Sequence, residues 1–367
     1  MLTDVLLILG GLVLLVLGGE LMVRGAGSLA RRLGMSPLVV GLTVVSVATS
    51  APELAVTVDS VLTGAPELAV GNVIGSNTAN VLLILGAGAL MAALSVQRQL
   101  LRFDLPVMIV LSVALLLLSL DGSLSLLDGV ILLAAFVGIM VTTVLLGRRA
   151  VREAAVDGDG DADGEDAPAP VWVSVAFVAV GVAALVLGAR LLVSGAVSIA
   201  SGLGVSELII GLTIVALGTS LPELAATVAA VRRGEVDIAV GNVVGSNVAN
   251  IGLVLGLPAV MSPAGLPVPP SSVALDLPLM IAAALALGTV AFTGHTVERL
   301  EGGVFVALYV AYLGYMVLAS SEHDALRGFS LVMVAFVLPL LIVVGAVTVW
   351  QEVQLRRGAQ GRLERVG

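Results

Sequence analysis

The sequence predicts an all-α polytopic membrane protein of two inverted-topology five-helix repeats, ten spanning helices in all, with an eleventh helix near the C-terminus. Three observations lead to this fold class. The 367 residues are 59% hydrophobic and only 12% charged, whereas about 25% of the residues of a soluble domain are charged. Several stretches long enough to cross a bilayer contain no Asp, Glu, Lys or Arg. The two halves of the chain also repeat each other's most polar motifs.

The apolar runs divide the chain into spans and connecting segments. The first run lacks a basic leader and a small-residue cleavage site, so we interpret it as a spanning helix and not as a signal peptide. We expect a first repeat over 1–150, an acidic cytoplasmic linker over 151–170, a second repeat over 171–320, and an extra helix with a basic tail over 321–367. The predicted spans lie at 4–24, 37–62, 67–92, 104–120, 128–147, 171–195, 207–231, 237–261, 275–293, 302–319 and 329–350.

The distribution of arginine predicts the orientation in the membrane. With the N-terminus outside, 15 of the 17 basic residues, all of them arginine, fall in inner loops or in the C-terminal tail. The exceptions are Arg190 and Arg327. Because cytoplasmic loops carry an excess of Lys and Arg, we expect an outside N-terminus and, with eleven spans, a cytoplasmic C-terminus.

The linker contains the acidic run from Asp157 to Asp166. The spacing of Asp159, Asp161 and Asp163 resembles the start of an EF-hand loop, but Pro170 occupies the twelfth position, where a bidentate Glu belongs. We interpret the run as a disordered, solvated linker, with a weak local calcium sensor as the alternative.

The internal repeat is the most specific pattern in the sequence. Residues 41–58 match 211–228 at 12 of 18 positions, and residues 70–86 match 240–256 at 12 of 17. Both matches have the same offset along the chain. Five helices per copy is an odd number, so the second copy enters the membrane from the opposite side. Inverted repeats of this kind place a substrate site between the copies near the bilayer midplane.

The first repeated motif is Thr-Ser-x-Pro-Glu, which ends at Glu53 in one copy and at Glu223 in the other. Proline removes a backbone hydrogen bond within the helix, and broken backbone at membrane depth is tolerated where it lines a cavity or is buried in protein. Hydroxyls, released carbonyls and a carboxylate form an all-oxygen environment, which hard cations such as Ca²⁺ and Na⁺ prefer. The candidate ligands here are Thr49, Ser50 and Glu53, and Thr219, Ser220 and Glu223.

Two glutamates at the centre of the membrane need compensation. Each ionised carboxylate costs at least ~2.5–3.5 kcal/mol at that depth, and the sequence places no Arg, Lys or His at the same depth. A bound cation is the simplest compensating charge. The alternative is a pair of protonated, hydrogen-bonded glutamic acids.

The second repeated motif is Gly-Asn-x-x-Gly-Ser-Asn-x-x-Asn. Its first Asn, its Ser and its last Asn share one helix face, because they are spaced four residues apart. We expect Ser76, Asn80, Ser246 and Asn250 to be ligands. For Asn72, Asn77, Asn242 and Asn247, ligation and interhelical hydrogen bonding remain equal alternatives.

The doubled motifs resemble the two alpha-repeats of the cation/calcium exchanger superfamily, particularly its prokaryotic sodium/calcium exchangers. The resemblance covers about residues 1–320, with the alpha-repeats at 41–86 and 211–256. It implies a ten-helix core with the ions between helices two, three, seven and eight, and with helices one and six as a mobile gating pair. It also implies the plasma membrane of a prokaryote, and it adds the backbone carbonyls of Ser46 and Ala216 to the ligands.

The chain departs from the family pattern in three places. The first repeat reads V-A-T-S-A-P-E instead of L-G-T-S-L-P-E. Asn80 and Asn250 are both amides, whereas some members of the family carry Asp at one of these positions. The span at 329–350 is additional to the family's ten.

These patterns predict a secondary antiporter that exchanges Ca²⁺ for Na⁺, with H⁺ coupling as the alternative and a passive cation channel as a third. We expect no enzyme activity, because no nucleophile–base pair or aspartate pair is evident at membrane depth. Cysteine is absent and the net charge is −9, so we expect no thiolate chemistry, no nucleic-acid partner and no cofactor besides the transported ions.

Overall fold

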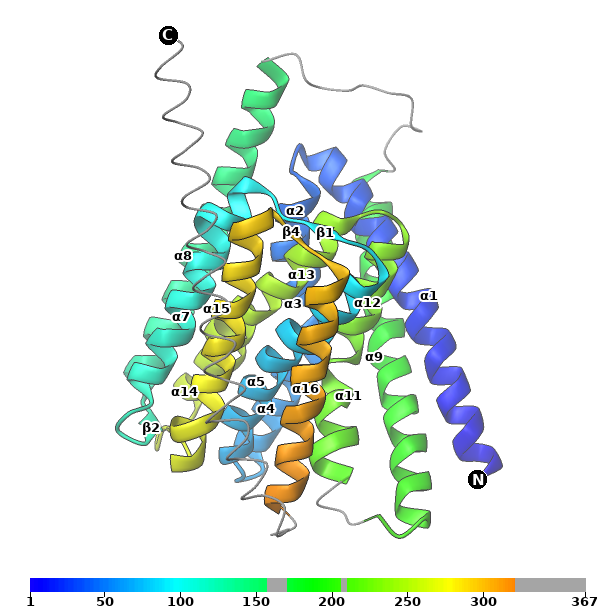
Figure 1. Ribbon diagram of the computed structural model, residues 1–367, viewed down its shortest axis with the longest axis vertical. Helices are drawn as coiled ribbons and strands as arrows, with labels where there is room; N and C mark the ends of the chain where they lie inside the picture. The colour runs from blue at the N-terminus through cyan, green and yellow to red at the C-terminus, as the bar shows by residue number, and fades with distance from the viewer. Residues whose placement is uncertain (157–169, 206–209, 321–367) are drawn as a thin grey trace.

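The computed structural model describes residues 1–156, 170–205 and 210–320 (Figure 1). In these ranges, nine helices are long and apolar enough to cross a membrane, and one bent helix pair brings the number of spans to ten. The predicted ten-helix core is therefore confirmed. The predicted span at 329–350 and most of the predicted linker, residues 157–169, lie outside the described residues.

The first repeat consists of helices, short strands and π-helical segments, the last of which are labelled η. Its elements are α1 (Leu2–Leu33), α2 (Pro37–Val40), η1 (Gly41–Val45), α3 (Ser46–Thr49), α4 (Ala51–Leu62), α5 (Glu67–Ala79), η2 (Asn80–Leu85), α6 (Gly86–Met91), β1 (Leu94–Ser95), η3 (Leu100–Asp104), α7 (Leu105–Leu118), β2 (Ser123–Leu124) and α8 (Leu126–Val156).

The second repeat follows the same order within its described residues. Its elements are α9 (Val171–Gly202), η4 (Gly211–Val215), α11 (Ala216–Thr219), α12 (Leu221–Arg232), α13 (Val236–Ala249), η5 (Asn250–Leu255), α14 (Gly256–Met261), β3 (Leu266–Pro267), η6 (Ser272–Asp276), α15 (Leu277–Gly294), β4 (Thr296–Val297) and α16 (Arg299–Ser320).

The π-helical segments occur at equivalent positions of the two repeats. η1 and η4 begin at the equivalent glycines Gly41 and Gly211, and η2 and η5 begin at the equivalent asparagines Asn80 and Asn250. π-helical turns are rare and are concentrated at functional sites. The sequence does not predict them, because the apolar pattern of a buried helix carries no sign of one extra residue in a turn.

The third and eighth spans form the centre of the molecule. In the most apolar window of each of these two spans, 78% and 83% of the residues are buried, against 17–28% for the spans that contain α1, α8, α9 and α16. The peripheral helices therefore expose apolar side chains. They lie around a central pair of helices (Figure 1). The two helices that carry the Gly-Asn-x-x-Gly-Ser-Asn-x-x-Asn motif are thus the ones most shielded from lipid.

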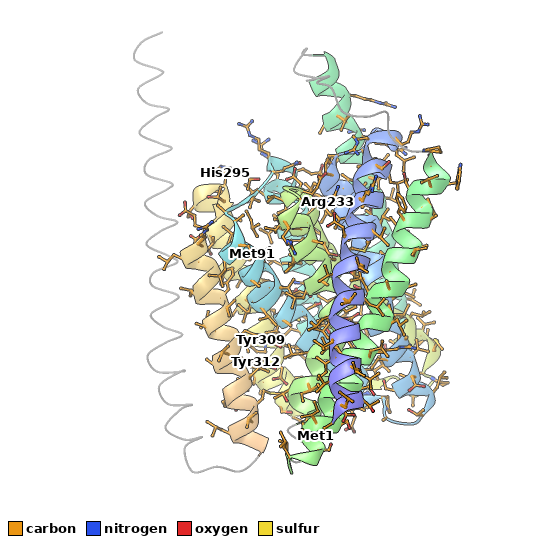
Figure 2. All side chains as sticks on the ribbon, turned by 90° about the vertical axis from the view of Figure 1, so that its right-hand side faces the viewer. Met1, Met91, Arg233, His295, Tyr309 and Tyr312 are labelled. Atoms are coloured by element: carbon orange, nitrogen blue, oxygen red, sulfur yellow. The ribbon has the colours of Figure 1, made fainter. Side chains whose placement is uncertain are left out.

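Helices α1 and α9 lie side by side along the edge of the molecule (Figures 1 and 2). Glycines spaced seven residues apart on both helices form their antiparallel contact. A methyl group on Gly11 would lie 2.6 Å from the carbonyl oxygen of Gly188, and one on Gly18 would lie 2.8 Å from that of Gly181. Small residues allow membrane helices to approach closely, and here they bring two 32-residue helices into backbone contact.

Two short antiparallel ladders connect the repeats. β1 pairs with β4, and β2 pairs with β3, so each ladder joins one strand of the first repeat to one strand of the second. Each strand has only two residues, and such strands have no sequence signal of their own. The ladders nevertheless hold the loops of the two repeats together.

Candidate functional site

The two glutamates of the repeated motif lie directly after a break in their spans. Glu53 is in the first turn of α4, and Glu223 is in the first turn of α12. The preceding residues Ser50 and Ser220 leave the helical conformation, with ψ angles of 3°. The second break bends the span by 57°. Proline in the next turn explains why the helix restarts there, since proline is favoured in a first turn and disfavoured in an interior.

Both carboxyl groups are fully buried. Glu53 and Glu223 have no exposed surface, and their four carboxylate oxygens have no hydrogen-bond partner among the described residues. The Glu53 carboxylate lies near Thr219 and Ser220, and the Glu223 carboxylate lies near Thr49 and Ser50. Each acidic group thus faces the hydroxyls of the opposite repeat, close to the other glutamate.

Six further side-chain oxygens, all from the two repeated motifs, are also buried and lack a hydrogen-bond partner among the described residues. Buried side-chain oxygens without a partner belong to Ser50, Ser76, Asn80, Thr219, Ser220 and Asn250. Together with the carboxylates they are ten oxygen atoms, and no nitrogen belongs to the set within the described part of the chain. Proteins normally satisfy buried polar atoms. Ten unpartnered oxygens, all from the two repeated motifs, therefore indicate a site for an electron-pair acceptor, that is, a cation.

No basic side chain in the described part of the chain forms an ion pair with either glutamate. In the described ranges, the ion pairs are Met1 with Asp4 and Arg233 with Glu20, both away from the site. The same ranges contain no group of three or more His, Cys, Asp or Glu residues that could hold a metal ion. The groups that this site can offer to a cation are therefore two carboxylates and several neutral oxygens.

Amide pairs across the repeat boundary orient the asparagines of the site. The side-chain amide of Asn80 donates to Oδ1 of Asn247 at 3.0 Å, and that of Asn250 donates to Oδ1 of Asn77 at 3.0 Å. Because the NH₂ groups of Asn80 and Asn250 are used in this way, their Oδ1 atoms remain available. Asn77 and Asn247 act as positioning residues.

Asn72 and Asn242 tie each motif helix to its neighbour. Asn72 donates to the carbonyl oxygen of Glu53 at 3.4 Å and to the hydroxyl of Thr57 at 3.1 Å. Asn242 makes the same contacts with Glu223 and Thr227, at 3.4 and 3.2 Å. Of the two readings that the sequence left equal, interhelical hydrogen bonding is the one that these contacts support.

Of the remaining predicted ligands, Thr49, Ser246 and Ser46 have polar contacts in the structure. The hydroxyl of Thr49 bonds to Oδ1 of Asn242 at 3.1 Å and lies 3.5 Å from the hydroxyl of Ser246. The carbonyl of Ser46 accepts hydrogen bonds from the backbone N–H of Ser50 at 2.9 Å and from the Thr49 hydroxyl at 3.2 Å. Ala216 begins α11, and in that repeat the N–H of Ser220 bonds to Leu217 instead. Ligation by these residues stays a prediction.

Comparisons with known proteins point in one direction. A family model described as "Sodium/calcium exchanger protein" matches residues 3–145 and 173–318. The CaxA protein of Alkalimonas amylolytica is 37% identical over 322 residues, which are 88% of this chain and 100% of CaxA. The sodium/calcium exchanger MaX1 of Methanosarcina acetivorans is 34% identical over 340 residues, with 84% of this chain and 97% of MaX1 covered.

Solved structures extend the similarity to the fold. The sodium-calcium exchanger NCX_Mj, soaked with 10 mM Na⁺ and no Ca²⁺, matches with a TM-score of 0.72 at 30% sequence identity. The match covers 85% of this chain and 98% of that chain.

Proposed function

Because the chain belongs to the sodium/calcium exchanger family, we propose that it is a secondary antiporter that exchanges Ca²⁺ for Na⁺ by alternating access. The observation that carries the proposal is the set of ten buried, unpartnered oxygens that belong to Glu53, Glu223 and six other residues of the two motifs. Ca²⁺ takes about 6–8 oxygen ligands, so the set contains enough donors for it without any water.

Exchange follows from the sharing of ligands. The two carboxylates can neutralise one Ca²⁺, or Na⁺ ions bound to overlapping oxygens, so one kind of ion excludes the other. An empty site leaves two buried charges uncompensated, which is costly in a low-dielectric interior. Reorientation is then favourable only when the site is filled, and this is the condition for coupled exchange.

The ligands that we propose are the side chains of both repeats at this interface. They are Thr49, Ser50, Glu53, Ser76 and Asn80, with Thr219, Ser220, Glu223, Ser246 and Asn250, and the carbonyls of Ser46 and Ala216. The orientation that we propose, with the N-terminus outside a prokaryotic plasma membrane, rests on the arginine distribution.

A proteoliposome assay tests the coupling. Vesicles that contain the purified protein and Na⁺ are diluted into Na⁺-free buffer with radioactive Ca²⁺, and uptake is compared with vesicles without a Na⁺ gradient. We expect uptake only with the gradient, and it should saturate with Ca²⁺ concentration. Gradient-independent flux that does not saturate would indicate a channel instead.

Proton coupling is the second candidate, because two buried carboxylates without a basic partner are also able to accept protons. The same vesicles with a pH gradient and no Na⁺ distinguish the two. Ca²⁺ uptake driven by the pH gradient alone would replace Na⁺ with H⁺ in the proposal and leave the site unchanged.

A further inference from the structure

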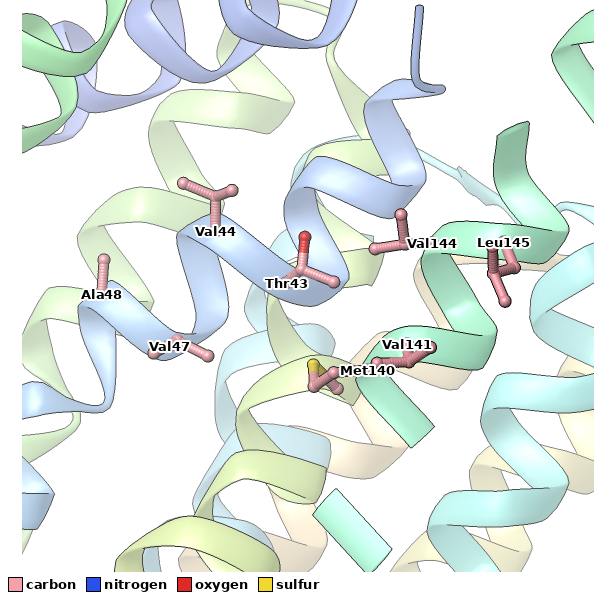
Figure 3. A pocket seen from close by; sticks show the side chains of 8 residues that line it. All are labelled: Thr43, Val44, Val47, Ala48, Met140, Val141, Val144 and Leu145. Atoms are coloured by element: carbon pink, nitrogen blue, oxygen red, sulfur yellow. The ribbon is translucent and has the colours of Figure 1, made fainter. Parts of the chain in front are cut away.

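A groove on the outside of the membrane domain lies behind the candidate ion site. It has a volume of about 560 Å³ and lies between the second span and α8 (Figure 3). Its walls are Thr43, Val44, Val47 and Ala48 on one side and Met140, Val141, Val144 and Leu145 on the other. All eight belong to segments that cross the membrane, and all are exposed or half-buried, so the groove faces lipid among the residues that the structure describes.

The groove lining offers nothing to a polar ligand. Thr43 is its one polar side chain, and the Thr43 hydroxyl donates to the carbonyl oxygen of Val39 at 2.6 Å. The other seven residues are aliphatic or Met. An apolar chain therefore fits this surface, and the bilayer supplies such chains at high concentration.

Arginines continue the α8 wall of the groove toward the arginine-rich membrane surface. Val141, Leu145, Arg148 and Arg152 follow one another at steps of three or four residues, so they share one face of α8. At 1.5 Å per residue, Arg148 lies about 5 Å and Arg152 about 10 Å beyond Leu145 along the helix. Both arginines are exposed. The wall therefore runs from apolar to cationic along one line.

The geometry points to a binding site for an anionic phospholipid, with one acyl chain in the groove and the phosphate group on Arg148 and Arg152. Charge complementarity selects this occupant, because basic residues next to a membrane attract anionic lipid headgroups. A zwitterionic lipid offers the same chains but no net charge. The arginines are placed where the headgroup of a lipid in that leaflet lies.

The occupied groove would support the site-bearing helix from behind. The same segment carries both groove residues and predicted ligands. The groove residues Val44, Val47 and Ala48 are interspersed with the buried residues Ser46, Thr49 and Ser50, which belong to the candidate ion site. The groove also adjoins η1, whose π-helical turn departs from regular helical hydrogen bonding. A bound chain supplies packing contacts that this irregular stretch otherwise lacks on its lipid side.

Native mass spectrometry of the delipidated full-length protein tests the site without any transport assay. Phosphatidylglycerol and phosphatidylcholine with identical acyl chains are titrated separately. We expect one phosphatidylglycerol to bind more tightly than phosphatidylcholine. The double substitution Arg148→Gln with Arg152→Gln should weaken phosphatidylglycerol binding by about tenfold or more, and it should weaken phosphatidylcholine binding by a smaller factor, because the choline cation offsets the charge of the phosphate.

Matched control variants distinguish lipid binding at this groove from a general electrostatic attraction of anionic lipid to the protein. Arg32→Gln with Arg232→Gln removes the same charge from exposed arginines outside α8, and it should have no effect. Leu145→Trp, or Val141→Trp if the first variant folds poorly, should fill the groove and weaken both lipids. Val110→Trp, at a lipid-facing position of α7 that is 66% exposed, should weaken neither. Equal binding of the two lipids, or equal effects of the two arginine pairs, would overturn the proposal.

Discussion

Thr49 donates a hydrogen bond to Oδ1 of Asn242 at 3.1 Å, across the boundary between the two repeats. The hydroxyl of Thr219, its repeat equivalent, is buried and has no partner among the described residues. The backbone around these residues differs too, since Ser50 N–H bonds to Ser46 and Ser220 N–H bonds to Leu217. Near-identical motifs therefore adopt two arrangements in one molecule.

This asymmetry is what alternating access requires of an inverted repeat. Two halves with the same sequence pattern exchange their arrangements when the site changes the side to which it opens. Under our proposal, the opposite state would contain a hydrogen bond from Thr219 to Asn72 and would lack the one from Thr49 to Asn242. The four residues of the two bonds are Thr49, Asn72, Thr219 and Asn242.

Replacing either glutamate by glutamine is expected to abolish Ca²⁺ binding in practice. Removing one charge from a buried group of charges that compensate one another costs about 3–5 kcal/mol. The affinity for Ca²⁺ should therefore fall by about 100-fold or more. Calorimetric titration of Glu53→Gln and Glu223→Gln in detergent would measure it. The exposed residue Glu67 provides the control, because Glu67→Gln removes the same charge outside the site.

Stability without Ca²⁺ provides a second readout of the same variants. The empty wild-type site contains two uncompensated carboxylates, so Glu53→Gln should not lower the unfolding temperature in a chelator. It should remove the rise in that temperature when Ca²⁺ is added, because ligand binding to the native state is what stabilises it. If Ca²⁺ raised the unfolding temperature of both glutamine variants as much as it raises that of the wild type, the proposed site would be refuted.

Asn242→Leu is expected to destabilise the protein more than Asn72→Leu. Both substitutions remove an amide that bonds a glutamate carbonyl and a threonine hydroxyl. Asn242 additionally accepts the hydrogen bond of Thr49. One hydrogen bond inside a membrane protein contributes about 0.6–1 kcal/mol, so the two variants should differ by about that amount in reversible unfolding. Equal destabilisation would contradict the asymmetry described above.

Gly18→Val is expected to disrupt the contact between α1 and α9. The added Cβ would lie 2.8 Å from the carbonyl oxygen of Gly181, closer than a carbon atom tolerates. Overpacking of this kind costs about 1–3 kcal/mol. Gly10→Val is the control, since nothing lies within 4 Å of a Cβ at Gly10. The comparison needs only the thermal unfolding of both variants in detergent, and similar unfolding temperatures would argue against the glycine seam.

The ion pair between Glu20 and Arg233 connects α1 to the end of α12, and Arg233 is labelled in Figure 2. Its side chains are 49% and 36% exposed, so screening by water limits its contribution to about 0–1 kcal/mol. Glu20→Arg should therefore lower stability only slightly, and adding Arg233→Glu should recover the loss. A double-mutant cycle at low and high salt measures the coupling, which should shrink as salt rises. A coupling that is independent of salt would show that charge is not its origin.

Part of the fold could be predicted from the sequence because it is encoded locally. A bilayer-spanning helix needs only a run of apolar residues, and the Thr-Ser-x-Pro-Glu motif marks its own helix break. The constant offset between the two copies and the odd number of helices in each predict the inverted repeat. The grouping of Glu53 and Glu223 with hydroxyls and amides followed from the same repeat.

Other features depend on contacts between distant segments and were not predicted. Neither the two β ladders nor the π-helical segments had been expected. The roles of the asparagines and serines in the second motif also needed the structure, because a single helix face does not reveal which amide bonds to which helix. Asn77 and Asn247 became positioning residues only once their partners across the repeat were known.

The sequence by itself determined that the chain crosses a membrane repeatedly and that its halves are inverted copies, and it predicted two glutamates as the charged groups of the candidate site. Only the tertiary structure decided which buried oxygens lack partners, how closely α1 approaches α9, and that the two motifs differ in arrangement. The physical reason is that composition and repeats are properties of the linear sequence. Hydrogen-bond satisfaction and packing are properties of segments that lie far apart in the sequence, and they exist only when those segments meet.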